Sequence, residues 1–95
     1  KNNIDYKVQV LAGHRIISSE YMNKAYNYNG KYSIESHEGW IKYSIGNYSK
    51  YIYARNIRNE LKKYKFPGPF VSAYNYGQRI TVQEALIVSG QNWVP

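Results

Sequence analysis

The stretch that decides the fold is Trp40–Tyr64, WIKYSIGNYSKYIYARNIRNELKKY. In its first part, Ile41, Tyr43 and Ile45 alternate with Trp40 and polar residues. Successive side chains of an extended chain point to opposite faces, so a period of two is typical of a strand with one buried face. The sequence therefore predicts a strand at the start of this stretch, with its apolar side chains turned to a core.

The second part of the same stretch predicts a helix, Ser49–Tyr64. Gly46-Asn47 breaks the alternation, and Ser49 stands where a helix N-cap is expected to accept a backbone N–H. Apolar residues then recur at spacings of three and four, which is the period of an amphipathic helix. These residues are Ala54, Ile57, Leu61 and Tyr64. The helix is expected to end before Pro67-Gly68-Pro69, because proline cannot continue it.

Length and composition predict one small folded domain. A chain of 95 residues can build a single core. Its hydrophobic content of 43% and aromatic content of 17% are typical of a folded chain. No apolar run is long enough to span a membrane. With neither an initiator Met nor a signal peptide at its start, the segment is expected to be cut from a longer protein.

Residue types also limit the chemistry that the chain can perform. With no Cys, disulfides and thiolate metal sites are excluded, and His14 and His37 are far apart in sequence, so we expect no metal and no cofactor. The net charge of +7 predicts attraction to nucleic acid, to an anionic envelope polymer or to a membrane surface. The alternative is a solvated basic face without a ligand. The 12 tyrosines suit either a core or a stacking surface.

The remaining elements are predicted around the central stretch. Strands are predicted at Tyr6–Ala12, Lys31–His37, Trp40–Ile45 and Phe70–Tyr76, with Glu38-Gly39 as a two-residue hairpin connection. Short helices are predicted from Ser18 or Ser19 to about Tyr26, and from the capping box Thr81–Glu84 through about Ile87. Residues 6–87 form the predicted domain, between flexible flanks at 1–5 and 88–95.

This order predicts an α+β fold of the RNP or ferredoxin-like type, βαββαβ, followed by a short C-terminal helix. Four antiparallel strands would carry two helices on one face and leave the other face open. Because Val8 and Val10 belong under the helices, Gln9 between them is expected on the open face. By the same alternation, the open face also receives Trp40, Lys42, Ser44, Phe70, Ser72 and Tyr74.

The residues of this face suggest a binding surface. The amide of Gln9 offers two donors and an acceptor to a ligand, although it could be an ordinary solvated strand position. Trp40 suits stacking on a ligand, or packing against a loop or a chain end. Lys42 alone indicates little.

The chain resembles the SPOR domain, the sporulation-related repeat that binds peptidoglycan. The resemblance rests on YKVQV at 6–10, WIKYSIGNYS at 40–49, the Ala54–Lys62 spacing, FPGPFVSAY at 66–74 and GQRITVQEAL at 77–86. It is similar to the variant common in Bacteroidetes-type envelope proteins.

The resemblance implies an RNP-type fold whose open face binds glycan through Gln9, Trp40, Lys42 and Phe70. It also implies a role in the periplasm, targeting the parent protein to the cell envelope or to the division septum, with peptidoglycan glycan strands as the partner.

No catalytic constellation is present in the sequence. Glu35 and Glu38 are the only close carboxylate pair, and they flank a hairpin where simple solvation explains them. We therefore expect a non-catalytic binding module. Two alternatives remain open: an RRM-like domain that stacks single-stranded RNA, although residues 42–45 lack the RRM signature, and a protein–protein adaptor that uses the sheet edge or the basic helix face.

Overall fold

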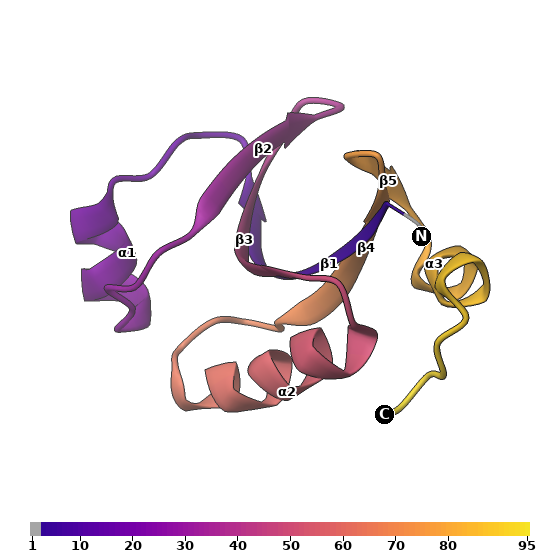
Figure 1. Ribbon diagram of the computed structural model, residues 1–95. Coiled ribbons are helices and arrows are strands. Elements are labelled where there is room, and N and C mark those ends of the chain that lie inside the picture. The colour runs from indigo at the N-terminus through magenta and orange to yellow at the C-terminus, as the bar shows by residue number, and fades with distance from the viewer. Residues whose placement is uncertain (1–2) are drawn as a thin grey trace.

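A curled antiparallel sheet of five strands forms the centre of the computed structural model, which describes residues 3–95 (Figure 1). The strands lie in the order β2-β3-β1-β4-β5. Their bounds are β1 Ile4–Gly13, β2 Ser33–His37, β3 Trp40–Tyr48, β4 Phe70–Asn75 and β5 Gln78–Ile80. The strands bend into a half-barrel. The helices lie around the outside of this half-barrel and leave its concave side uncovered (Figure 1).

The helices differ in how they meet the sheet. Their bounds are α1 Ser19–Tyr26, α2 Tyr51–Glu60 and α3 Val82–Ser89, with a 3-10 turn, η1, at Leu61–Lys63. Helix α2 packs under the convex side, against β1, β3 and β4 (Figure 1). Helix α3 packs against β4 and β1, whereas α1 stands apart from α2 at the β2 end (Figure 1).

The predicted ferredoxin-like βαββαβ arrangement is therefore wrong, although the α+β class and the antiparallel pairing are confirmed. Helix α1 does not lie beside α2 under the sheet, because its eight residues bury only Met22 and offer no apolar face that could cover strands. The sheet also has a fifth strand, β5, at a position where no strand was predicted. Coverage of the convex side thus falls to α2 and α3.

The apolar side of the strands faces α2 as predicted. Val8 and Val10 are buried, and the ring of Tyr6 meets that of Tyr51 edge-on, with the centroids 5.8 Å apart. The predicted helix stripe is also present: Ala54 and Leu61 are buried, and Ile57 and Tyr64 are partly buried against the same core. The stripe begins one turn earlier than predicted, at Tyr51, which is 2% exposed.

Strand β3 runs past the predicted turn at Gly46-Asn47. Its pairing with β1 shifts from Tyr6↔Tyr48 to Val8↔Ile45, so β3 carries one extra residue at this point. Gly46 has φ +78°, in the left-handed region that glycine enters without a steric penalty. An extra residue with a left-handed glycine is a β-bulge, which bends a strand without ending it.

Two helix starts were predicted correctly and one was not. The Ser18 hydroxyl accepts the Tyr21 N–H at 3.1 Å, and the Thr81 hydroxyl accepts the Glu84 N–H at 3.1 Å. The N-cap of α2 is Lys50 rather than Ser49, and its side chain makes no capping bond.

The start of α2 is capped instead from the C-terminal segment. The N–H of Tyr51 donates to the Gln91 side-chain oxygen at 2.6 Å, and the Tyr51 hydroxyl donates to the Val94 carbonyl at 2.8 Å. The flank predicted at 88–95 thus contacts the domain. In the other flank β1 begins at Ile4, and residues 1 and 2 lie outside the described part of the chain.

Candidate binding site

Strand register places most of the predicted site residues on the concave side of the half-barrel. Gln9 lies directly opposite Ser44 on β3 and Phe70 on β4, and Ser72 lies opposite Lys7. Residues opposite each other in adjacent strands share a face. Tyr74 follows Ser72 on the same side of β4, so the concave face combines side chains from the inner three strands.

This face is not the flat, open surface that the sequence predicted. Gln9, Ser44, Ser72 and Tyr74 are all buried, with exposed fractions of 7%, 3%, 2% and 2%. The curl of the sheet is the reason, because it brings β4 close to β2 across two intervening strands. The Tyr74 hydroxyl spans this gap and donates to Glu35 Oε1 at 2.8 Å.

Arg79 of β5 completes a polar network inside the curl. Its Nη1 donates to Gln9 Oε1 at 3.1 Å and lies 3.5 Å from the Tyr74 hydroxyl. Its guanidinium also lies over the Tyr74 ring, 5.6 Å from the centroid. Gln9 therefore acts as an acceptor that orients Arg79, and its amide oxygen is already used. Sequence reasoning missed Arg79 because a strand of three residues is too short to show a period.

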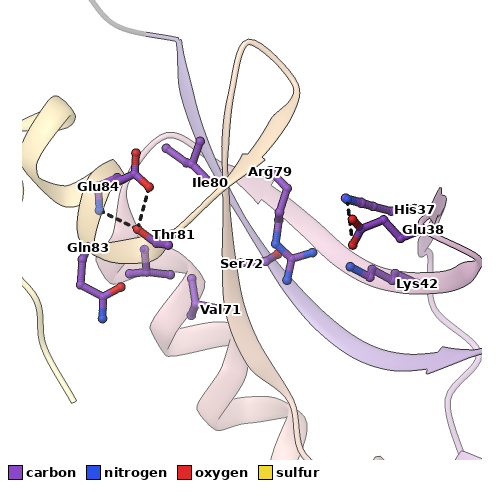
Figure 2. A pocket seen from close by; sticks show the side chains of 11 residues that line it. His37, Glu38, Lys42, Val71, Ser72, Arg79, Ile80, Thr81, Gln83 and Glu84 are labelled. Atoms are coloured by element: carbon purple, nitrogen blue, oxygen red, sulfur yellow. Dashed lines mark hydrogen bonds and ion pairs between the residues drawn. The ribbon is translucent and has the colours of Figure 1, made fainter.

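A cleft of about 670 Å³ opens beside this network (Figure 2). In Figure 2 the Lys42 side chain on β3 points toward the guanidinium of Arg79 on β5, and Ser72 lies beside Arg79 on the side away from Lys42. The hairpin between β2 and β3 and the start of α3 complete the walls. Its other lining residues are His37, Glu38, Val71, Ile80, Thr81, Val82, Gln83 and Glu84.

Lys42 and Arg79, the cations of the cleft, form no ion pair with an acidic side chain among residues 3–95. Within residues 3–95, the only ion pair joins His37 Nε2 to Glu38 Oε1 at 3.6 Å. Lys42 lies opposite Glu35 on β2, but the carboxylate of Glu35 accepts the Tyr74 hydroxyl instead. Lys42 and Arg79 are thus available to a ligand with acidic or hydroxyl groups.

Two of the three predicted aromatic residues, Trp40 and Phe70, remain accessible, and neither lines the cleft. Trp40 is 44% exposed and Phe70 45%. One face of the Trp40 ring is covered by the imidazole of His14, with centroids 4.1 Å apart and planes tilted by 33°. Trp40 therefore packs in part against a loop, as one of the two interpretations of the sequence predicted. The rest of its ring is open to a ligand.

The described chain contains neither a group of metal ligands nor a helix that could span a membrane. No three His, Asp or Glu side chains among residues 3–95 are grouped so that they could hold a metal ion. In the same range, every helix is too short or too polar to cross a membrane. The carboxylates of Glu35 and Glu38 have separate partners, Tyr74 and His37.

No protein-family model, curated protein or solved structure matches the chain. The function is therefore inferred from the residues of the cleft and their geometry.

The buried tyrosines predict an alkaline loss of stability. Burial raises the pKa of Tyr74 above its ordinary value of 10.0, and its hydrogen bond to Glu35 adds to this, while Ser72 and Arg79 oppose it. Burial likewise raises the pKa of Tyr6 and Tyr28. A raised pKa means that the folded protein keeps a proton that the unfolded chain releases, so stability is complete below pH 10 and falls above it.

Denaturant unfolding between about pH 8 and about pH 11 measures this loss. We expect Tyr74→Phe to flatten the decline, since it removes one of the three groups, and Tyr76→Phe to leave it unchanged, because Tyr76 is 79% exposed. Equal slopes for the wild type and Tyr74→Phe would contradict the role given to burial.

Proposed function

We propose that this domain is a non-catalytic module that binds glycan strands of bacterial peptidoglycan in the cleft and so places its parent protein in the cell envelope. One observation carries the proposal: Lys42 and Arg79 face each other across a polar cleft and form no ion pair with any acidic residue in the described part of the chain. A cell-wall polymer offers hydroxyl, acetamido and carboxylate groups, which are acceptors for such donors. The partly open Trp40 ring suits stacking on a sugar ring.

The proposal assigns different roles to the residues that the SPOR resemblance singled out. Lys42 and Trp40 are expected to contact the glycan directly. Gln9 is expected to act as a positioning residue, since its oxygen already accepts Arg79. Arg79 is then expected to donate to the glycan in place of Gln9, and the exposed ring of Phe70 to contribute apolar contact.

Pelleting with purified peptidoglycan sacculi tests the proposal. We expect Lys42→Gln and Arg79→Gln each to weaken binding about tenfold or more, because a hydrogen bond to a charged group contributes about 1.5–3 kcal/mol. Lys62→Gln removes the same charge from an exposed position on η1 and should bind like the wild type. Equal weakening by Lys62→Gln would mean that the net charge, rather than the cleft, causes binding.

The two tryptophans offer a second matched comparison. Trp40→Ala should reduce pelleting, whereas Trp93→Ala should not, although Trp93 is the more exposed of the two at 61%. Circular dichroism of each variant checks that it is folded.

The alternatives are outcomes of the same assay. If the wild type stays in the supernatant but binds single-stranded RNA with a steep salt dependence, the RNA-binding reading replaces this one. If the wild type binds neither polymer, a role as a protein–protein adaptor replaces the glycan-binding proposal.

A further inference from the structure

A second hollow, of about 250 Å³, lies on the half-barrel where β1, β3 and the start of β2 meet. We propose that it binds a single oxyanion group, a phosphoryl or carboxylate. Its lining contains two lysines, two serines and an asparagine side chain, and no acidic residue. The lining residues are Lys7, Lys31, Tyr32, Ser33, Ser44, Gly46 and Asn47.

The hydroxyl of Ser44 supplies the first line of support. Ser44 is 3% exposed, and its Oγ has no hydrogen-bond partner within residues 3–95. The neighbouring Ser33 does not satisfy it, because the Ser33 hydroxyl donates to the Ser44 carbonyl at 3.4 Å. A buried hydroxyl without a partner is unfavourable. An anion in the hollow would accept a hydrogen bond from the Ser44 hydroxyl.

Two cations supply the second line of support. Lys7 Nζ lies 4.7 Å from the centroid of the Tyr74 ring, which holds the ammonium over the concave side. The loop that contains Lys31 is held by Tyr28, because the hydroxyl of this buried residue donates a hydrogen bond to the Lys31 carbonyl at 2.6 Å. Neither lysine is part of an ion pair in the described chain.

The β3 bulge shapes the floor of the hollow. The extra residue in β3 brings both Gly46 and Asn47 into the lining. The place of a Cβ at Gly46 is taken by the ring of Tyr48, and Asn47 adds an amide that can donate to an oxygen. Cations, hydroxyls and an amide around a small volume form a donor set without a competing carboxylate. This set differs from that of the larger cleft, which includes Glu38 and Glu84.

The inference does not rest on glycan binding, and its test does not use a polymer. Inorganic phosphate is added to ¹⁵N-labelled protein, with acetate as a second arm and sodium chloride keeping the ionic strength constant. We expect saturable shifts of the backbone amides around Ser33, Ser44 and Asn47 with at least one of the two anions. The anion that saturates identifies the group as phosphoryl or carboxylate.

Variants separate this site from general attraction to a basic protein. Lys7→Gln and Lys31→Gln should each weaken binding about fivefold or more. Lys24→Gln, which removes an exposed charge on α1, should not weaken it. Ser44→Ala should weaken binding without lowering the melting temperature, because its hydroxyl makes no hydrogen bond in the protein.

Two results would overturn the inference. One is the absence of saturable shifts at these amides with either anion. The other is equal weakening by Lys24→Gln and Lys31→Gln, which would show that binding depends only on the total charge.

Discussion

Replacing Leu61 with alanine is expected to lower the free energy of unfolding by about 2–5 kcal/mol, the usual cost of a large-to-small change in a core. Leu61 is 5% exposed and is the last fully buried side chain of the α2–η1 stripe. Its truncation would leave a cavity between the helix and the convex side of the sheet. Because small domains are stable by only about 5–15 kcal/mol, this loss is a large fraction of the total stability.

Urea unfolding of Leu61→Ala measures this loss. The neighbouring Lys62→Ala is the matched control, since Lys62 is exposed and its change should shift the free energy of unfolding by less than about 0.5 kcal/mol. A loss near zero in Leu61→Ala would mean that the α2 stripe does not pack as described.

Replacing Gly46 with alanine is the second change with a large expected effect, about 2–5 kcal/mol in total. A left-handed conformation costs a residue with a Cβ roughly 1–2 kcal/mol. At Gly46, where φ is +78°, the new Cβ would also clash with the ring carbon Cε2 of Tyr48. Tyr48 packs against the core, so its ring cannot move without exposing apolar surface, and such overpacking costs about 1–3 kcal/mol more.

Gly39 is a matched control for this prediction. Its φ is +80°, but a Cβ built there would meet no atom within 4 Å. Gly39→Ala should therefore show the backbone cost alone, about 1–2 kcal/mol, and Gly46→Ala should exceed it. If the two variants lose equal stability, the Tyr48 ring moves freely and the contact at the bulge is not restrictive. Gly46→Ala should also weaken binding of the anion that saturates the proposed oxyanion site, because Gly46 lines that site.

Local patterns predicted the elements well where the signal was long or chemically specific. The alternation in β1 and β3 identified their apolar sides, and the spacing from Ala54 to Leu61 identified the buried side of α2. The serine and threonine before α1 and α3 gave the correct caps, because capping depends on neighbours within four residues. The start of α2 was misplaced because its capping partner, Gln91, lies 40 residues away.

The candidate site was predicted in part. Alternation placed Gln9, Lys42, Ser44, Ser72 and Tyr74 on one side of the sheet, and the strand register agrees. Their burial could not be predicted, since it comes from the curl of the whole sheet. Arg79 was missed because its strand is too short to show a period.

The sequence by itself determined the order of the main elements, the apolar side of each long strand and the basic character of the surface. These properties depend on periods, caps and charges that neighbouring residues carry. Only the tertiary structure decided that α1 does not pack beside α2 under the sheet and that β5 extends the sheet. It also decided that the sheet curls until Tyr74 reaches Glu35. Such contacts join residues far apart in the chain, and their geometry depends on the bulges and packing of the whole sheet, which no local pattern encodes.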